Sequence, residues 1–428
     1  MTLPENEIKE LEERSRKLRV ETFDLARQYG GYHFGGALSA VEILVTLYKK
    51  ILKPEDIFIL SKGHATFSWY PLLIERGFNP VISGHPDIDI KNGIWCTTGS
   101  LGMGFPTGAG LALAKKIKKE NGKIYVLLGE AEFQEGTGWE TLLYASQHKL
   151  DNLIGIVDRN LHQGSGAVKD ILSLGNLVSK LNSFGAEVYQ ADGHSHSDLF
   201  DRLCAAKETK EKPTIIIADT IKGKGISFME QEQDKWHAKF PLGKLEQVYK
   251  ELGEECKDIK SEIEFKKSID LRKDFGKTIT EIAEKDDKII LLTGDYESGL
   301  EVFKEKFPNR CINMGTTEQS MISLAAGMAI SGLRPVVYSV TPFILERPFE
   351  QVKICIDQQK VPVMLVGFDD YPEHGPTHAA LDASATAALF KNIKSYFPKN
   401  SSETKEAIID AYNSNGPTFI RLKRDYAC

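Results

Sequence analysis

Short apolar runs rich in Val, Ile and Leu recur along this chain and alternate with longer stretches of helical character. In the first half of the sequence, such runs occupy residues 123–129, 153–158 and 214–219. Continuous apolar runs are typical of parallel strands that are buried on both faces. Parallel neighbours need crossover connections, and the helical stretches between the runs can supply them. The alternation therefore predicts an α/β fold, with mainly parallel sheets flanked by helices.

The same pattern starts afresh in the last third of the chain. Its apolar runs lie at residues 288–295, 334–340, 361–368 and 417–422. The stretch before them, 244–268, is rich in charge and poor in aromatic residues, which is typical of a partly helical linker. A length of 428 residues also suits two domains. We therefore predict a first domain at 1–243, a linker at 244–268 and a second domain at 269–428.

Composition argues against several classes of protein. The formal net charge is −6 and there is no long stripe of lysine or arginine, so no nucleic-acid partner is expected. No run approaches the roughly 18 apolar residues of a membrane span, and the charged start is unlike a signal peptide. Six widely spaced cysteines form no C-x-x-C pair, which argues against a zinc site or a disulfide framework. We expect a cytoplasmic protein without membrane association.

Polar residues that could bind a metal ion follow two of the predicted strands. Glu130 comes directly after the run at 123–129, and Asn160 and His162 follow the run at 153–158. Ligands bind beyond the carboxyl ends of parallel strands, so these residues should share an edge of the sheet. A carboxylate, an amide oxygen and a backbone carbonyl suit a hard divalent cation. Taken alone, the same residues could be solvated turn residues.

A glycine-rich stretch at residues 97–104 lies directly before a helix-forming segment. Gly99, Gly102 and Gly104 let the backbone approach a ligand closely and adopt left-handed dihedrals. An anion at the start of the following helix would be stabilised by the free backbone N–H groups there. The stretch is weak evidence by itself, but it predicts a turn that can hold a diphosphate.

Several segments, in order, resemble the transketolase family of thiamine-diphosphate-dependent enzymes: 31–41, 60–65, 83–86, 97–104, 133–140, 152–160, and 222–230 followed by Trp236-His237. In that family a Gly-Asp-Gly motif precedes an asparagine by about thirty residues, as Glu130 precedes Asn160 here. Glu130 and Ala131 replace the aspartate and the second glycine. The resemblance implies thiamine diphosphate and Mg²⁺, and the longer carboxylate arm leaves Ca²⁺ or Mn²⁺ as alternatives.

The resemblance also assigns roles in the first domain. It implies metal ligation by Glu130, Asn160 and His162, and cofactor contacts from Gly99, Leu101, Ala131, Glu132, Asn160, His64 and His237. Imidazole groups move protons near neutral pH, and the histidines at family positions are His33, His64, His85 and His237. His33 and His85 are further expected to meet the substrate. A single such histidine is more often structural, and His148, His194 and His196, which match no catalytic position, are expected to be so.

In the second domain, residues 315–318 resemble the family's Gly-x-x-Glu element, whose glutamate contacts the aminopyrimidine ring. A buried Glu318 with its pKa raised by apolar surroundings could bond the ring nitrogen and favour its imino tautomer. The alternative is a carboxylate that only stabilises a helix N-terminus. Phe343 is expected to stack on the pyrimidine, while Phe349 is either a second wall of that site or a core residue. Asp295 matches an aspartate beside the thiazolium ring.

Residues 373–378 resemble the family element Asp-Gly-Pro-Thr-His. His378 matches its histidine, and His374 replaces the aspartate that addresses a donor hydroxyl, so the donor itself could differ. Arg272 and Arg424 fall where the family binds a substrate phosphate, a task that suits the guanidinium fork. Surface charges remain an alternative for both, and Gly299 stands where the family has a serine.

The function that the resemblance implies is transfer of a two-carbon ketol unit from a ketose, or its phosphate, to an aldose through a cofactor-bound dihydroxyethyl intermediate. The implied partners are sugar or sugar-phosphate substrates and a second copy of the chain, as a homodimer with active sites at the subunit interface. The sequence stops shortly after Arg424, so a short form without the family's third domain is expected. Two alternatives stay open: an enzyme resembling 1-deoxy-D-xylulose-5-phosphate synthase, which decarboxylates a 2-oxo acid, and a catalytically degenerate scaffold.

Overall fold

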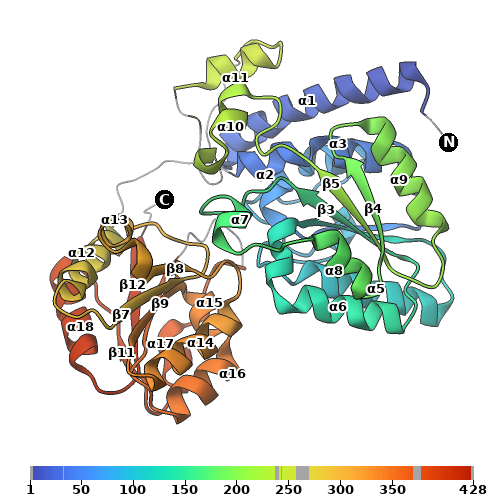
Figure 1. Ribbon diagram of the computed structural model, residues 1–428. Coiled ribbons are helices and arrows are strands. Elements are labelled where there is room, and N and C mark those ends of the chain that lie inside the picture. The colour runs from blue at the N-terminus through green and yellow to red at the C-terminus, as the bar shows by residue number, and fades with distance from the viewer. Residues whose placement is uncertain are drawn as a thin grey trace. The chain divides into compact units, whose positions relative to one another are not determined.

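The chain divides into two compact units, Met1–Ile263 and Glu264–Cys428. A computed structural model describes residues 3–31, 33–236, 241, 243–256, 269–369 and 377–425. Each unit contains one parallel sheet between layers of helices (Figure 1). The α/β fold with parallel sheets is therefore confirmed. No helix in the described ranges has the length and apolar character needed to cross a membrane.

The sheet of the first unit has five parallel strands in the order β1-β2-β3-β5-β4. The strands are β1 (Ile57–Leu60), β2 (Ile124–Gly129), β3 (Leu153–Arg159), β4 (Glu187–Asp192) and β5 (Thr214–Asp219). The apolar runs of the sequence form β2, β3 and β5, which lie at the centre of the sheet or next to it. The edge strands β1 and β4 were not predicted, because they are short or carry polar residues.

Helices cover both faces of this sheet (Figure 1). One face carries α1 (Glu5–Tyr29), α3 (Val41–Thr46) and α9 (His196–Glu208), and the other carries α5 (Gly104–Lys118), α6 (Gly136–Gln147) and α8 (Leu177–Ser183). Alternate side chains of β2 serve the two cores, because successive strand residues point to opposite faces. Tyr125 and Leu127 pack on the α1 side, and Val126 and Leu128 on the α5 side.

A third apolar cluster joins the start of the chain to the segment expected to be the linker. The remaining labelled α-helices of this unit are α2 (Phe34–Ser39), α4 (Tyr70–Glu75), α7 (Val168–Ile171), α10 (Ser227–Gln231) and α11 (Leu245–Glu251). Val248 and Tyr249 of α11 are fully buried with Phe23 of α1. By its contacts, α11 is therefore part of the first unit.

The sheet of the second unit has six parallel strands in the order β11-β12-β10-β9-β7-β8. They are β7 (Ile289–Thr293), β8 (Cys311–Asn313), β9 (Arg334–Val340), β10 (Met364–Phe368), β11 (Lys394–Tyr396) and β12 (Thr418–Leu422). The four predicted runs form β7, β9, β10 and β12. A separate antiparallel pair consists of β6 (Ile269–Asp270) and β13 (Arg424–Asp425).

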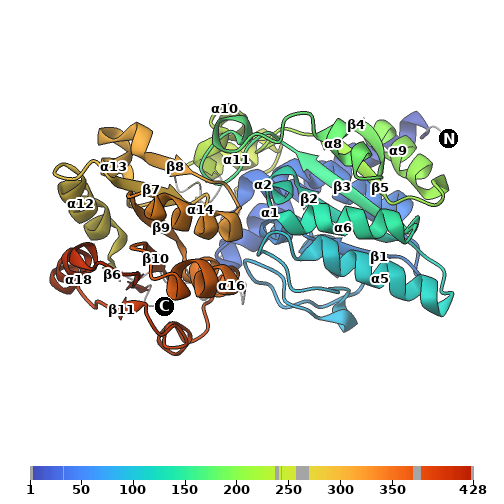
Figure 2. The same ribbon diagram turned by 60° about the horizontal axis from the view of Figure 1, so that its bottom comes forward.

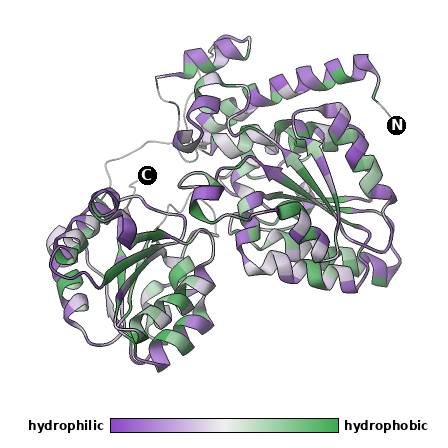
Figure 3. Cartoon of the chain, viewed as in Figure 1, coloured by the Kyte–Doolittle hydropathy of each residue, from purple (hydrophilic) through white to green (hydrophobic). Residues whose placement is uncertain are grey.

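Two helical layers enclose this second sheet (Figure 2). One layer contains α12 (Arg272–Ala283), α13 (Glu301–Lys306) and α18 (Ser401–Asn413); the other contains α14 (Glu318–Ile330), α15 (Thr341–Leu345), α16 (Phe349–Gln351) and α17 (Ala383–Ala387). The central strands of both sheets are largely hydrophobic, while hydrophilic residues lie on the outer helix surfaces (Figure 3). Burial of the apolar runs is thus what holds each unit together.

Candidate active site

The carboxyl ends of β2 and β3 bring Glu130 next to the Asn160 turn. An oxygen of the Glu130 carboxylate, Oε2, accepts the backbone N–H of Leu161 at 2.8 Å. Asn160 Oδ1 accepts the backbone N–H of His162 at 3.1 Å. Glu130 is only 7% exposed, and this burial raises its pKa to about 7. The structure therefore gathers the three residues predicted as metal ligands at one edge of the sheet.

The Asn160 turn is also strained. Leu161 adopts a positive φ of 64°, a conformation that a branched side chain rarely takes and that concentrates at functional sites. Within the described ranges, no group of three or more His, Cys, Asp and Glu side chains is arranged to hold a metal ion. A cation bound by Glu130 would therefore also need oxygens from a backbone carbonyl, from Asn160 and from the bound cofactor.

The glycine-rich loop packs too tightly for larger residues. Gly102 has φ 81°, and a Cβ atom there would lie 2.6 Å from Thr137 Oγ1. A Cβ on Gly104, the first residue of α5, would lie 2.5 Å from Ser61 Oγ. Gly99 has φ 131°. The loop thus needs its glycines, and it presents the backbone at the start of α5, as an anion-binding turn requires.

The buried Glu132 side chain connects two strand ends in this region. Its carboxylate accepts the backbone N–H of Gly129 at 3.0 Å and the hydroxyl of Ser61 at 2.5 Å. Burial raises the pKa of Glu132 above its usual value. The described contacts make Glu132 a link between the end of β2 and the end of β1. Ala131, the other residue of this turn that was predicted to meet the cofactor, is half-buried beside it.

Three of the four predicted histidines lie together. The ring centroid of His33 is 5.8 Å from that of His64 and 5.6 Å from that of His85, both in edge-to-face arrangements. A Cβ on Gly36 would lie 2.6 Å from His64 Nε2, so glycine gives the imidazole its room. His237, the fourth, lies outside the described residues.

Two buried lysines at this edge were not predicted from the sequence. Lys62 and Lys222 are each 1% exposed. Lys62 Nζ pairs with the Asp158 carboxylate and donates to the Gly36 carbonyl at 2.8 Å. Lys222 Nζ donates to the Gln163 carbonyl at 2.9 Å, just beyond the Asn160 turn. Asp158, at the end of the apolar run that forms β3, could have indicated a buried cation nearby, because a buried charge needs a partner.

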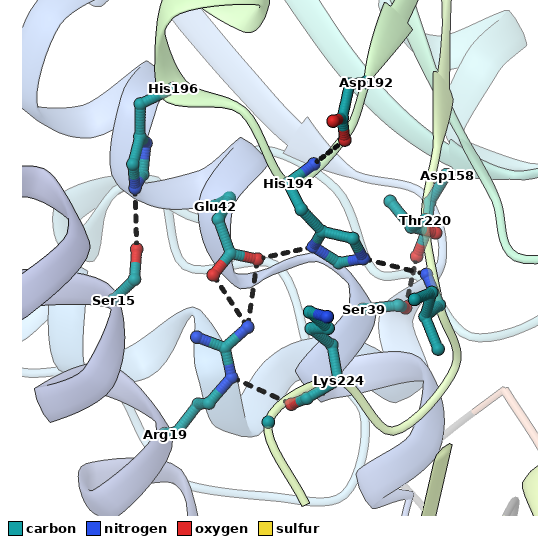
Figure 4. A network of polar contacts seen from close by, with 12 residues as sticks. Ser15, Arg19, Ser39, Glu42, Asp158, Asp192, His194, His196, Thr220 and Lys224 are labelled. Carbon is teal, nitrogen blue, oxygen red and sulfur yellow. Dashed lines mark hydrogen bonds and ion pairs between the residues drawn. The ribbon is translucent and has the colours of Figure 1, made fainter. Parts of the chain in front are cut away.

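One buried carboxylate fixes both sides of the turn that carries Lys222 (Figure 4). Glu42 of α3 pairs with Arg19 at 2.7 Å and with His194 Nδ1 at 2.8 Å. His194 Nε2 accepts the backbone N–H of Ile221 at 2.8 Å, so its proton must be on Nδ1. Arg19 Nε donates to the Lys224 carbonyl at 2.8 Å. Burial alone would raise the pKa of Glu42, but Arg19 and His194 lower it.

In the second unit, four side chains form what we call the Glu318 cluster: Glu318, Phe343, Arg347 and His378. Glu318 is the first residue of α14 and is 2% exposed. Its carboxylate Oε2 accepts a hydrogen bond from Arg347 Nη1 at 2.8 Å. The Arg347 guanidinium lies 4.4 Å from the ring centroid of Phe343, and that ring meets the His378 ring edge-on at 5.3 Å.

The setting of Glu318 corrects one expectation. Apolar surroundings were expected for this acid, whereas the structure gives it a guanidinium partner. Arg347 was missed although it lies in the segment that contains Phe343, four positions further on. In a helical turn that spacing brings two side chains together. The predicted residues Glu318, Phe343 and His378 do lie together.

Phe349 and Asp295 lie elsewhere in the second unit. The Phe349 ring packs on Phe390 at a centroid distance of 5.0 Å, within the apolar cluster under α14, which matches the core alternative. Asp295 follows β7 with a positive φ of 58°, and its backbone N–H donates to Asn313 Oδ1 at 3.3 Å. A non-glycine residue in this conformation is a strained position, which is in keeping with a functional role.

The two arginines predicted to bind a substrate phosphate lie beside one another. Arg424 pairs in register with Asp270 across the β6–β13 ladder. Arg272 Nε and Nη2 donate to the two oxygens of the Asp270 carboxylate at 2.8 and 2.7 Å. A Cβ on Gly299 would lie 2.7 Å from Arg272 Cβ. The fork of Arg272 is therefore engaged within the protein. His374 lies outside the described residues.

The residues present suit thiamine diphosphate, which has an anionic tail and an aromatic ring. The first unit offers a glycine loop at a helix start with two buried lysines nearby, and the second offers a buried acid beside an aromatic ring. These features belong to the class of thiamine-diphosphate-dependent transferases. The family model for the transketolase thiamine diphosphate binding domain matches residues 12–314, and the one for the transketolase pyrimidine binding domain matches residues 267–428. The chain belongs to the transketolase family.

Individual relatives agree with this assignment. Human transketolase is 28% identical over 476 residues, which cover 98% of this chain and 75% of that protein. One subunit of the apulose-4-phosphate transketolase of Actinobacillus succinogenes is 39% identical over 269 residues, or 58% of this chain and 97% of that protein. The structure of transketolase from Campylobacter jejuni subsp. jejuni NCTC 11168 covers 98% of this chain and 79% of its own, with a TM-score of 0.54. At 23% identity, that likeness supports the fold alone.

Proposed function

We propose that this protein transfers a two-carbon ketol unit from a ketose or ketose phosphate to an aldose acceptor, with thiamine diphosphate as its cofactor. The observation that carries this proposal is the group of three imidazole rings, in which His33 lies at centroid distances of 5.8 Å from His64 and 5.6 Å from His85. Imidazoles both donate and accept hydrogen bonds near neutral pH, which suits a donor with several hydroxyl groups. The family assignment points in the same direction.

The first unit would hold the diphosphate and its cation. We assign the diphosphate to the glycine loop with Gly99 and Leu101, to His64 and to the turn that contains Ala131 and Glu132. When bound, the cofactor supplies a carbon nucleophile that can break and remake a carbon–carbon bond next to a carbonyl. His237 is proposed as a further contact from the sequence alone.

The proposed cation site consists of Glu130, Asn160 and His162, with Mg²⁺ as the first candidate. Burial raises the pKa of Glu130 to about 7, which disfavours its ionised form when no cation is bound. A hard cation binds the ionised form of such a ligand. Ca²⁺ and Mn²⁺ tolerate a longer ligand arm better than Mg²⁺ does, since Mg²⁺ demands near-ideal octahedral geometry.

The second unit would bind and activate the aminopyrimidine ring. The Glu318 carboxylate would hold the ring nitrogen by a hydrogen bond, and Phe343 would stack on the ring face. Asp295 is proposed beside the thiazolium ring. His378 would donate to the substrate, as would His33 and His85. Arg424 is proposed to bind a substrate phosphate. Arg272 could bind one only if its guanidinium released the Asp270 carboxylate.

We further propose a homodimer in the cytoplasm as the active form. One relative is named as a single subunit of its enzyme, and it matches 58% of this chain, so a second polypeptide is a reasonable arrangement for that protein. This chain matches both domain models, and two copies would therefore provide complete sites. Because one relative is named for apulose 4-phosphate, that sugar phosphate belongs among the donors to be tested.

The proposal can be tested by binding and turnover together. Calorimetry should show binding of thiamine diphosphate in the presence of Mg²⁺, and the complex should form a ketol product from a ketose phosphate only when an aldose is added. Carbon dioxide release from pyruvate would instead indicate the 2-oxo acid alternative. A protein that binds no thiamine diphosphate with Mg²⁺, Ca²⁺ or Mn²⁺ would indicate a scaffold and end the proposal.

A further inference from the structure

The segment that carries Arg347 is unusually well anchored. The backbone N–H groups of Glu346 and Arg347 both donate to the Pro342 carbonyl at 2.9 Å, which closes the turn after α15. Pro348 follows directly and restricts the backbone further. The side-chain amide of Gln319, next to Glu318, donates from Nε2 to the Arg347 carbonyl at 3.4 Å. The backbone of Arg347 is therefore linked to the start of α14 before its own side chain is considered.

The side chain of Arg347 joins the two groups proposed to meet the aminopyrimidine ring. Its Nη1 donates to Glu318 Oε2 at 2.8 Å, and its guanidinium lies 4.4 Å from the Phe343 ring centroid. The side chains of Arg347 and Glu318 are 7% and 2% exposed. A charge-assisted hydrogen bond in such a place is strong and directional. One arginine thus sets both the position of the acid and its distance from the stacking ring.

The groups around Glu318 other than Arg347 are uncharged, exposed or bound to other partners. A Cβ on Gly294, at the end of β7, would lie 3.4 Å from Glu318 Cγ and 3.1 Å from the uncharged Ser339. Glu346 accepts the backbone N–H of Leu381, and Glu350 and Lys353 are exposed. Asp295 follows Gly294, and His378 lies against Phe343. Arg347 is the cation that contacts the acid within the described part of this unit.

We propose that Arg347 is a positioning residue that holds the Glu318 carboxyl group in one orientation beside the Phe343 ring. The inference rests on the proposed function, because the role of Glu318 is part of it. A charge-assisted hydrogen bond to a guanidinium fixes the direction of a carboxyl group. A rotated Glu318 would no longer share a proton with the ring nitrogen, so both cofactor affinity and turnover depend on the arginine.

The first test uses the protein without cofactor. Arg347→Gln leaves the buried Glu318 carboxyl group without its cationic partner, and removing one partner of a buried ion pair is destabilising. The melting temperature of Arg347→Gln should therefore fall below that of the unsubstituted protein by about 3 °C.

Two further variants decide how that result is interpreted. Arg347→Gln combined with Glu318→Gln should recover part of the loss, because no unpaired carboxyl group remains. Arg347→Lys should keep most of the stability, since it retains the charge. An unchanged melting temperature in Arg347→Gln would overturn the proposal, and so would a loss that is undiminished in the double variant.

The second test measures thiamine diphosphate affinity and turnover. Arg347→Gln should weaken binding by about tenfold, which is 1.4 kcal/mol, and lower kcat by at least tenfold. Arg347→Lys should recover part of both. Arg310→Gln is the matched control, because Arg310 stacks on Phe307 at 3.8 Å and donates to the Asp286 carbonyl without contacting Glu318. It should leave affinity unchanged.

The outcomes separate this inference from the proposed function. If the unsubstituted protein binds no cofactor, the proposed function fails. If it binds and turns over normally while Arg347→Gln matches it in affinity and kcat, the role of Arg347 is wrong and the function stands.

Discussion

The two units hold their buried charges in different ways. At the first sheet edge, Lys62 pairs with Asp158, and Glu42 binds both Arg19 and His194, so several charges share partners from four or more segments. In the second unit, Glu318 relies on Arg347, and aromatic rings lie around that pair. The first arrangement is a network that shapes backbone loops. The second places a single acid at a defined point.

This difference corresponds to two kinds of ligand chemistry. A diphosphate is recognised by loops that point N–H groups and cations inward, so the first unit uses its buried polar groups to fix loops. A ring nitrogen is recognised by one acceptor in the correct place, so the second unit uses stacking and one ion pair. Changes in the first unit should therefore affect stability most, and changes in the Glu318 cluster should affect turnover most.

The largest effect is expected from Glu318→Ala. Loss of the acid that activates the ring should lower kcat by about a thousandfold. The variant should still fold, with its apolar cores intact, which far-ultraviolet circular dichroism can check. Glu318→Gln, which keeps the shape of the side chain, should show nearly the same loss. Rates near those of the unsubstituted protein would show that Glu318 has no part in the mechanism. They would also contradict the expectation that changes in the Glu318 cluster affect turnover most.

The next effect should appear in stability rather than turnover. Lys62→Met leaves the Asp158 carboxylate buried without its main cation, which should cost about 3–5 kcal/mol of unfolding free energy. Chemical denaturation of the cofactor-free protein measures this loss. Lys62→Met combined with Asp158→Asn should recover part of it, because the unpaired charge is gone. A single-variant loss below about 1 kcal/mol would show that the buried pair is not a structural element.

A smaller loss is expected when the shared carboxylate of Figure 4 is neutralised. Glu42→Gln leaves Arg19 and His194 with a weaker acceptor and should lower the unfolding free energy by about 2 kcal/mol. The matched control is Glu21→Gln, because Glu21 pairs with Arg14 at 2.9 Å but its side chain is 42% exposed. That control should cost less than about 1 kcal/mol. Equal losses in both variants would contradict the network interpretation.

The smallest effect is a pH dependence that comes from His196. Its ring lies between the hydroxyls of Ser15 and Thr46, at 3.1 and 2.8 Å, and burial lowers its pKa to about 4. The unfolded chain binds a proton near pH 6.5, so stability is complete above that pH and falls as the pH drops toward 4. At pH 5.5 the loss should be about 1 kcal/mol. His196→Gln should flatten this slope in thermal melts, and an unchanged slope would exclude His196 as its source.

Local sequence patterns were sufficient to define the layers of the fold. Apolar runs became the central strands of both sheets because burial on two faces demands such runs wherever the chain crosses a core. Short motifs also identified Glu130, Glu318, Phe343 and three of the histidines as residues of interest, since these motifs lie at strand ends or helix starts. Of the edge strands of the first sheet, β1 was missed because it is only four residues long although fully buried, and β4 because it is partly exposed and carries polar residues.

Which charges meet depended instead on how the elements assemble in space. Arg347 pairs with Glu318 across 29 positions, Lys62 with Asp158 across 96, and Glu42 with His194 across 152. Local sequence biases a segment toward helix or strand, but the partner of a buried charge depends on which element ends arrive at the same place once the sheets have formed. The apolar setting expected for Glu318 was wrong for this reason, because its cation comes from a different turn of the chain.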